Sequence, residues 1–545
     1  MNFLRSAQLA LTPLSPIHIG CGEDFEPTNY VIDNGLLYGF DPSRAILPEI
    51  LRQRLSQLGD KADLLGIQRF FREYCQHFMP HAHVLMPVAA GLAADYERQV
   101  GQVANNEANG NRVFNQLFIE RASHSTNRPY IPGSSFKGAL RTTLIDAINN
   151  GRRVTDPDER KKSDRLEKRL LEGDFATSPL RLLKTADFMP AGEVARQVLY
   201  AVNRKKDSVI DKQTGQERQP RGIAARKECI AHGQYRALSS SVVLHDLSPH
   251  NNPKTTPSEA RRPSDLSQIA KDCNRYHLPR LINEMDILDR RSMLNPAWKK
   301  AIDNLLAGEV GNLLQNGMAM LVRLGRYGGA ESKTLSGEGV AQIRIMQGKG
   351  TPPIYQSTTK TVWLAAQNAN DQKHLIPFGW ALIEINPQHE QSQLKAWCDQ
   401  EAASRPDMQA IYAEFARAQA AAIEQKNQQA EQRANLEAAE KAKNDEEKRR
   451  AEQLLTMTAA QREIDTFCTE CQQRANQLVS KKDNPNTAYH AKANQLAKKA
   501  LESTDWTPEE RALAADAIEK WLPKIVAVDL KDVRKKLKLS ELRGQ

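Results

Sequence analysis

The most informative stretch of the sequence is Pro132-Gly133-Ser134-Ser135-Phe136-Lys137-Gly138-Ala139-Leu140-Arg141. The apolar run 117–119 before it predicts the end of a strand. Pro132-Gly133 breaks the chain, a serine is a good N-cap, and Asn150-Gly151 is a good helix stop. Between these signals, apolar residues recur at every fourth position, as on the buried face of a helix: Phe136, Leu140, Leu144 and Ile148. The segment therefore predicts a strand, a glycine turn and the N-terminus of a helix.

A helix N-terminus suits a phosphate, because its amides are unpaired and it carries a partial positive charge. Here cations lie one turn apart, serines add hydroxyl donors, and glycines let another backbone approach closely. The residues concerned are Gly133, Ser134, Ser135, Lys137, Gly138 and Arg141. The G-x-x-x-x-G-K-[ST] order of a nucleotide P-loop is missing. A capped amphipathic helix with two solvated cations is the alternative interpretation.

Bulk composition narrows the class of protein. A chain of 545 residues predicts about two to four domains. The net charge of +10 makes an anionic partner plausible, and nucleic acid leads that list. The seven cysteines are odd in number, and the one C-x-x-C pair is Cys468 and Cys471, which favours a reducing compartment. With no membrane-length apolar run and no signal-peptide core, we expect a cytoplasmic protein without a membrane partner.

The N-terminal part predicts half of an α+β sandwich. A strand at 8–12 leads into a turn at 13–23, which contains two prolines and the glycines Gly20 and Gly22. Asn34-Gly35, between the apolar runs 29–33 and 36–40, is a strong hairpin signal. A helix is then expected to begin near Pro42 and end near Leu58.

The segment Ile131 to Arg141 resembles the G-S-S-x-K-G-x-x-R signature of the RAMP proteins of type III CRISPR effector complexes. That resemblance implies RRM-like ferredoxin folds and a role in holding guide RNA. The opening turn, Thr12 to Glu23, and the hairpin, Tyr30 to Asp41, resemble more narrowly the family of the fifth subunit of the Csm complex. In pieces, the resemblance covers residues 8–386.

A second glycine-rich segment runs from Leu321 to Thr334. It departs from a P-loop at Ser332, where glycine would precede the lysine, and it lacks the strand–loop–helix context, so we reject ATP binding. Its side chains suit RNA: Arg323, Arg326 and Lys333 for phosphate, and Tyr327 for stacking on a base. It resembles a segment of the same family, as does the predicted strand at 376–385. A surface loop without a role in RNA binding is the alternative.

His18 allows two hypotheses. Some RAMP ribonucleases process guide RNA with a histidine as general acid–base, and a lone histidine in a loop suits that chemistry. No Tyr, Lys or second His lies nearby in the sequence to complete such a site. We therefore favour a histidine that orients the turn or touches RNA. Asp24 and Asp33 are not expected to be catalytic.

Between the two glycine-rich segments, a charged helix is expected at 152–171, and strands at 179–187, 193–203, 227–230 and 236–246. The basic stretches 204–206 and 218–226 belong to a predicted loop that either contacts phosphates or is solvated. A linker is expected at 246–263 and a helix at 264–288.

The C-terminal part resembles no family that we assign. Residues 409–455 favour a long exposed helix without an unbroken heptad. Residues 458–545 predict a small helical module, in which 505–510 form a capped helix start. Cys468 and Cys471 have no second ligand pair, so a metal site there is the weaker interpretation. The basic segment 531–543 is either an RNA or subunit contact or a solvated helix.

The sequence thus predicts an α+β protein of tandem RRM-like RAMP units followed by an all-α extension. The expected ranges are 1–262 and 263–395 for the RAMP units, 396–456 for a polar helical spacer and 457–545 for the helical module. No cofactor, no metal and no catalysis of its own are expected.

By resemblance, the chain would cap the 3′ end of the crRNA in a type III-A Csm ribonucleoprotein. It would contact the repeated backbone subunit and support crRNA maturation and antiviral defence, with target RNA nearby and host nucleases recruited. One alternative is a RAMP endoribonuclease that uses His18 as acid–base. The other is a RAMP subunit that holds the 5′ tag or forms the backbone.

Overall fold

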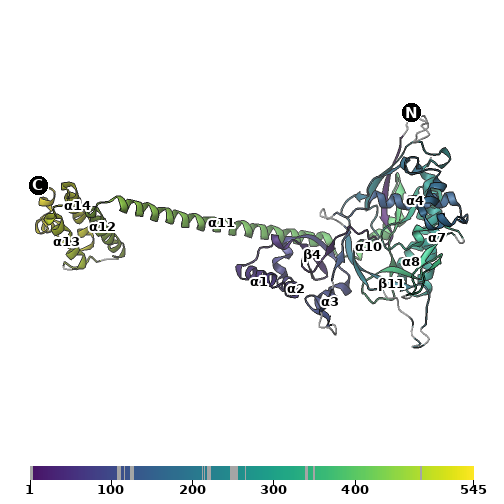
Figure 1. Ribbon diagram of the computed structural model, residues 1–545, viewed down its shortest axis with the longest axis horizontal. Coiled ribbons are helices and arrows are strands. Elements are labelled where there is room, and N and C mark those ends of the chain that lie inside the picture. The colour runs from purple at the N-terminus through teal and green to yellow at the C-terminus, as the bar shows by residue number, and fades with distance from the viewer. Residues whose placement is uncertain are drawn as a thin grey trace. The chain divides into compact units, whose positions relative to one another are not determined.

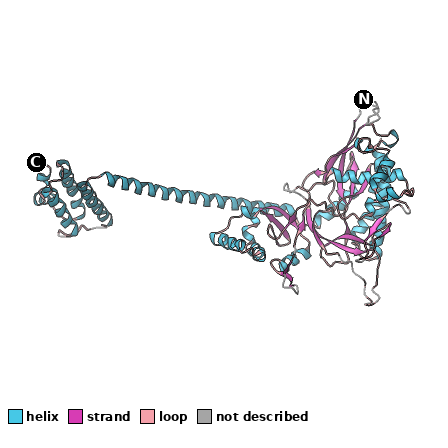
Figure 2. Ribbon diagram, viewed as in Figure 1, coloured by secondary structure: helices cyan, strands magenta, loops and turns pink. Residues whose placement is uncertain are grey.

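The computed structural model describes residues 4–106, 112–115, 117–122, 128–210, 213, 215, 217, 222–245, 256–263, 265–337, 340, 342–347, 350–478, 481–485 and 487–545. The chain divides into two compact units, residues 1–423 and 424–545. All strands of the described residues lie in the first unit (Figure 2). The basic residues 218–221 and most of the predicted linker, 246–255, lie outside the described residues.

One sheet has the strand order β10-β13-β1-β19-β14, with β9 also paired to β13. The bounds are β1 (Leu4–Pro13), β9 (Leu183–Thr185), β10 (Met189–Pro190), β13 (Leu238–His245), β14 (Ala319–Arg323) and β19 (Trp380–Ile385). The N-terminal strand is central and antiparallel to both neighbours, with Leu9 opposite Ser240 on one side and Ile385 on the other. The predicted opening strand therefore organises this sheet.

Helices α4 (Gly133–Asn149) and α7 (Leu266–Arg290) pack together on this sheet (Figure 1). Phe136 and Leu140 of α4 are buried with Leu9 and Leu11 of β1, as the four-residue spacing predicts. Helix α4 ends where Asn150 adopts a left-handed conformation with φ 46°, a common way to stop a helix.

The second sheet has the order β18-β17-β11-β12-β8-β2. Its strands are β2 (Asp24–Phe25), β8 (Ile119–Glu120), β11 (Arg196–Lys205), β12 (Ala225–Ile230), β17 (Thr361–Ala366) and β18 (Ile376–Pro377). Both sheets thus combine strands from the predicted ranges 1–262 and 263–395. The two ranges interleave in space, and their boundary stays a prediction.

A hairpin and several helices complete the first unit. The hairpin of β3 (Tyr30–Asp33) and β4 (Leu36–Phe40) continues to β5 (Ala82–Pro87). Its turn is the predicted one, with positive φ at both Asn34 (47°) and Gly35 (74°). The remaining elements are α1 (Glu49–Asp60), α2 (Leu64–Glu73), α3 (Ala90–Gln99), β6 (Val103–Asn106), β7 (Arg112–Phe114), α5 (Pro157–Lys161), α6 (Ser163–Leu171), α8 (Pro296–Ala307), α9 (Glu309–Asn316), β15 (Ile343–Ile345), β16 (Ile354–Gln356) and α10 (Ser392–Ala403).

Four local predictions were wrong in detail. The single charged helix expected at 152–171 is two helices, α5 and α6, and Arg204 and Lys205, expected in a loop, lie in β11. The helix expected from Pro42 to Leu58 is a 3₁₀ turn at Pro42–Arg44 followed by α1, which begins only after Pro48. The residue before a proline avoids the helical conformation, so Pro48 interrupts the segment. The strand expected at 179–187 begins as a 3₁₀ turn at Pro179–Leu182, and only Leu183–Thr185 are extended.

The long helix α11 (Met408–Thr456) begins in the first unit, where Tyr412 donates a hydrogen bond to the Leu85 carbonyl. All its residues from 423 to 453 are exposed, as the composition predicts. Ion pairs between residues four positions apart, such as Arg433 and Glu437 at 3.0 Å, help to stabilise this exposed part of the helix.

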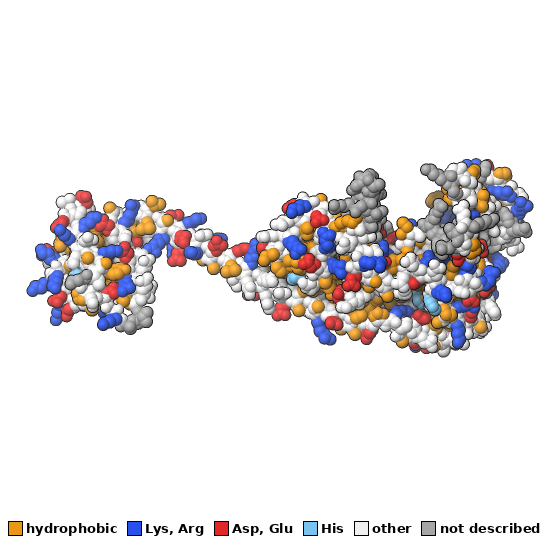
Figure 3. Space-filling view, turned by 90° about the horizontal axis from the view of Figure 1, so that it is seen from below, with side chains coloured by type: hydrophobic (Ala, Val, Ile, Leu, Met, Phe, Trp, Pro, Cys, Tyr) orange, Lys and Arg blue, Asp and Glu red, His pale blue; other side chains and the backbone are white. Residues whose placement is uncertain are grey.

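The second unit continues with α12 (Ala459–Gln477), α13 (Ala488–Glu502), α14 (Pro508–Ile525), α15 (Leu530–Lys536) and α16 (Leu539–Leu542). Helix α14 begins as predicted, because Thr507 and Glu510 cap each other's backbone and Pro508 occupies the first turn. On the face drawn in Figure 3, basic and acidic side chains are intermingled over this unit.

No helix among the described residues combines the length and apolar content of a membrane span. Within the same ranges, no group of three or more His, Cys, Asp or Glu side chains is placed to hold a metal ion.

Candidate nucleic-acid interface

A cleft of about 560 Å³ in the first unit brings together three stretches that are far apart in the sequence. They are the opening turn, the signature helix α4 and the second glycine-rich segment. The lining residues are Ile19, Gly20, Glu120, Ser135, Gly138, Ala139, Arg141, Thr142, Arg323, Leu324, Gly325, Arg326, Ser332 and Lys333. Tertiary structure thus gathers most of the residues that the sequence proposed for RNA.

The first turn of α4 is built differently from the prediction. Pro132, not a serine, is the N-cap residue, and the Gly133 amide donates to the Asp187 carboxylate at 2.7 Å. A Cβ on Gly133 would lie 2.6 Å from the Ala186 carbonyl oxygen. The close approach at Gly133 is therefore made by the chain's own backbone.

Gly138 has the opposite environment. It is exposed, it lines the cleft, and a Cβ built on it would meet no atom within 4 Å. Ser135 lines the same cleft, while Ser134 is exposed. Lys137 is half-buried, and burial together with the neighbouring Lys184 lowers its pKa. Two neighbouring cations raise the local potential, which favours an anion.

The arginines of the cleft are held by carboxylates. Arg141 uses Nε (2.8 Å) and Nη2 to bind Glu167 of α6. Arg323 is almost fully buried and donates to Glu284 of α7 and to the Phe378 carbonyl. The Nε and Nη2 groups of Arg323 are therefore engaged inside the protein.

The second glycine-rich segment packs directly on the opening turn. The Arg326 amide donates to the His18 carbonyl at 3.1 Å. Gly325 has a φ of 89°, and a Cβ on it would lie 2.3 Å from that same carbonyl oxygen. Glycine is required here by both its conformation and its contact.

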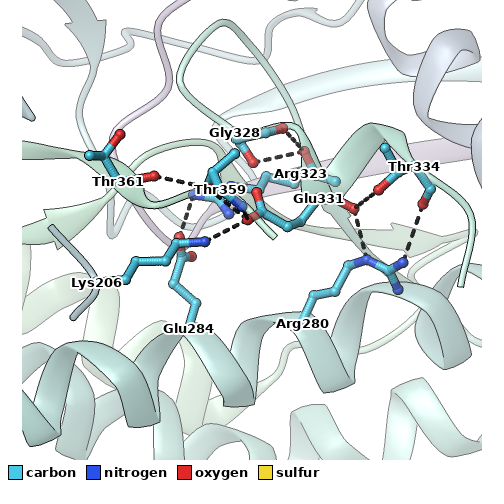
Figure 4. A network of polar contacts seen from close by, with 11 residues as sticks. Lys206, Arg280, Glu284, Arg323, Gly328, Glu331, Thr334, Thr359 and Thr361 are labelled. Atoms are coloured by element: carbon cyan, nitrogen blue, oxygen red, sulfur yellow. Dashed lines mark hydrogen bonds and ion pairs between the residues drawn. The ribbon is translucent and has the colours of Figure 1, made fainter. Parts of the chain in front are cut away.

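The other side of this segment is fastened by a polar network, shown in Figure 4. Glu331 accepts from Lys206 (2.5 Å) and from the amide and hydroxyl of Thr359 (2.6 and 2.7 Å). The Glu331 carbonyl accepts from Arg280 of α7, and the Ser332 hydroxyl donates to the Gly328 carbonyl. Although burial raises the pKa of Glu331, the bond from Lys206 and the other contacts hold it below its usual value. Lys333 follows this network and is exposed.

His18 lies beneath the cleft. It is 1% exposed, and its Nδ1–H donates a hydrogen bond to the Glu228 carbonyl at 2.7 Å. Nε2 faces Glu120 Oε1 at 3.5 Å, beyond a well-formed hydrogen bond. Burial lowers the pKa of His18, so the ring is neutral near pH 7. This environment orients the turn and keeps the imidazole away from solvent.

Glu120 is the functional candidate that the sequence did not indicate. Its carboxylate binds Lys227 and accepts from Arg326 Nη1 at 2.7 and 2.9 Å. A Cβ on Gly20 would lie 2.3 Å from Glu120 Oε1, so Gly20 makes room for this carboxylate. Glu120 ends a two-residue strand and belongs to no recognisable motif, so no sequence signal identified it.

Six of the predicted residues lie off the lining of the cleft: His18, Gly22, Gly133, Ser134, Lys137 and Tyr327. Tyr327 packs against Trp363 and Phe378, with ring centroids 5.3 and 5.2 Å away, so its ring contributes to the core. Gly22 is exposed with a φ of 86°, as the turn requires, and a Cβ there would meet no atom within 4 Å. Their contacts with RNA stay predictions.

Comparisons with known proteins identify several similar chains. The CRISPR system Cms protein Csm5 of Streptococcus thermophilus is 27% identical over 160 residues, which is 28% of this chain and 43% of that protein. The chain thus spans less than half of this relative's length.

Two solved structures are also similar. One is a chain in the cryo-EM structure of a Csm-crRNA-target RNA ternary complex of a type III-A CRISPR-Cas system, with 16% identity, a TM-score of 0.45, and coverage of 70% of this chain and 100% of that chain. The other is the crystal structure of T. onnurineus Csm5, with 15% identity, a TM-score of 0.41, and coverage of 69% and 99%.

The model of the RAMP superfamily matches residues 10–305, which is more than half of the chain. This range includes the opening turn, the hairpin and the whole of α4. The chain belongs to the RAMP superfamily.

Proposed function

We propose that this chain is an RNA-binding subunit of a type III-A CRISPR ribonucleoprotein that caps the 3′ end of the crRNA. In that complex it contacts the last backbone subunit and supports crRNA maturation and antiviral defence. The observation that carries the proposal is the cleft, which unites the signature helix, the opening turn and the second glycine-rich segment. The partial match to a Csm5 protein supports the type of complex.

The cleft suits recognition of a phosphate backbone. Arg326 is 62% exposed, and both of its bonds to Glu120 use Nη1. Its Nε and Nη2 have no hydrogen-bond partner among the described residues, and this edge of a guanidinium binds two phosphate oxygens side by side. Lys333 adds a second cation, and Gly138 opens a path for the sugar–phosphate chain. Because these groups read the backbone and not the bases, binding is largely independent of sequence.

The proposal includes no catalysis. A general acid–base must come within hydrogen-bond reach of the proton that it transfers. The His18 side chain has no exposed surface, and its Nδ1 proton is committed to the Glu228 carbonyl. This burial disfavours an endoribonuclease that uses His18.

The test is to purify the assembled complex from cells through a tagged copy of this chain and to sequence the ends of the bound RNA. The variant is Lys137→Ala/Arg326→Ala/Lys333→Ala. The matched control removes three cations from α8 and α10, as Lys299→Ala/Lys300→Ala/Lys395→Ala. Capping predicts guides with normal 5′ tags but longer, ragged or lost 3′ ends in the Lys137→Ala/Arg326→Ala/Lys333→Ala variant alone.

Other outcomes contradict the proposal. A defect confined to the 5′ tag would assign the chain to the other end of the guide. Recovery of no guide RNA with the unaltered chain would exclude an RNA-holding subunit. Uncut guide precursor, reproduced by His18→Ala in a chain that still binds RNA, would support the endoribonuclease.

A further inference from the structure

Glu120 places a negative charge in a cleft that we propose for phosphate. It is the last residue of β8 and lines the cleft together with Arg326 and Lys333. An ionised carboxylate repels a phosphate, so this position needs a physical explanation.

The contacts of Glu120 are with cations. Lys227 binds Oε2 from below and is only 9% exposed at its side chain, while Arg326 binds both oxygens from the open side. Burial raises the pKa of Glu120, but Lys227, His18 and Arg326 outweigh it and hold the pKa below the usual value. The carboxylate is therefore ionised at neutral pH, and with Lys227 and Arg326 it forms a group of net positive charge.

The geometry of Arg326 gives the carboxylate a function. Its side chain is largely exposed, and a free arginine on a surface samples many rotamers. Glu120 engages only Nη1, so it fixes the guanidinium plane while leaving the Nε and Nη2 edge open. Donors that are oriented before binding lose less entropy when the ligand arrives.

We propose that Glu120 is a positioning residue, which holds Arg326 so that its Nε and Nη2 edge faces an RNA phosphate in the cleft. The inference rests on the proposed function, because it assigns a role at the same RNA site. Glu120 does not touch the RNA. Its effect passes through the arginine.

The positioning role and a simple charge effect predict opposite changes in RNA affinity when Glu120 is neutralised. If Glu120 acted only by its charge, Glu120→Gln would remove a repulsion and tighten RNA binding. If Glu120 positions Arg326, the same change releases the guanidinium and weakens binding. A neutral glutamine at this position keeps the size of the glutamate, so the comparison isolates the charge-assisted bonds.

The experiment measures binding of the full chain to a short fluorescent single-stranded RNA across a series of salt concentrations. We expect Glu120→Gln to weaken binding about fivefold to tenfold and to lower the slope of log K against log salt by about 0.7, the value for one phosphate contact on a single strand. Arg326→Ala should do the same. The double variant should match Arg326→Ala alone.

Two further variants separate positioning from stability. Glu384 of β19 forms an ion pair with Nε and Nη2 of Arg236, outside the cleft. Glu384→Gln should lower the melting temperature without changing RNA affinity. Arg326→Lys keeps the charge but loses the planar fork, so it should weaken binding even if Glu120→Gln fails to fold.

The results that overturn the inference are distinct from those that overturn the function. Tighter or unchanged RNA binding by Glu120→Gln, in a folded chain, refutes positioning while leaving the cleft as the RNA site. A full Glu120→Gln effect in the Arg326→Ala background, or wild-type affinity in Arg326→Lys, refutes it as well. Unchanged binding by both Arg326→Ala and Lys333→Ala refutes the RNA site and, with it, the positioning role.

Discussion

Gly138→Ala is expected to stabilise the protein and to weaken its binding of RNA. Gly138 lies inside α4, where alanine is favoured over glycine by roughly 1 kcal/mol. A Cβ at this position meets no protein atom within 4 Å, so no steric cost opposes that gain. The free energy of unfolding should therefore rise by about 0.5 to 1 kcal/mol.

The expected effect on RNA has the opposite sign. In the proposed function the same open space admits the sugar–phosphate chain, so a methyl group there should displace the nearest phosphate from its donors. Loss of one charged hydrogen bond costs about 1.5 kcal/mol, which corresponds to a roughly tenfold increase in the dissociation constant. Gly138→Gln, with a longer side chain, should weaken binding further.

The assays are thermal unfolding followed by circular dichroism and titration of a fluorescent single-stranded RNA. Gly59→Ala is the matched control, because Gly59 lies in α1, outside the cleft, and a Cβ there also meets no atom within 4 Å. It should raise stability and leave RNA binding unchanged. Gly133→Ala should instead destabilise the fold by about 1 to 3 kcal/mol, since its Cβ would meet the carbonyl oxygens of Ala186 and Thr185 at 2.6 and 2.7 Å. If Gly138→Ala weakens RNA binding no more than Gly59→Ala does, the backbone path along α4 is wrong.

Three other predictions concern stability and the two units. His277 is buried, and desolvation lowers its pKa to about 3. Because the folded-state pKa lies below the ordinary value, the free energy of unfolding is highest above pH 6.5, and it should fall by about 2 kcal/mol by pH 5. Urea unfolding at pH 7 and pH 5 checks this, and an unchanged pH dependence in His277→Phe would contradict it. Thr507→Ala removes the N-cap hydrogen bond to the Glu510 amide (3.2 Å) and should cost α14 about 1 kcal/mol without altering RNA affinity, as unfolding and RNA titration can show. A chain that ends at Ile423 retains both sheets and the cleft, so it should bind RNA with wild-type affinity, and a large loss would place RNA contacts in residues 424–545.

Much of the secondary structure was predictable, because its signals are local. Asn34-Gly35 specifies a turn with positive φ at both positions, and it forms the β3–β4 hairpin. The apolar period of α4 and the capping residues before α14 likewise act within a few residues of chain. The α+β class and the helical C-terminal extension followed from these signals. Within the expected first helix, Pro48 disfavours the helical conformation of the residue before it, so the helix begins only at Glu49.

The sequence by itself determined which residue types are present for the proposed RNA binding and in which motifs they lie. Only the tertiary structure decided what each of them does. Gly133 and Gly138 belong to one motif, yet one faces the Ala186 backbone and the other faces the open cleft. Arg141 and Arg323 are held by Glu167 and Glu284, and these partners are 26 and 39 residues away.

Glu120 shows most clearly that the sequence alone does not reveal the partner of a charged side chain. It binds Arg326, which lies 206 positions further along the chain. The physical reason is that a charged side chain takes its role from the groups that pack around it. Contacts over such separations depend on how the two sheets and α4 fold together, and no local pattern in the sequence encodes them.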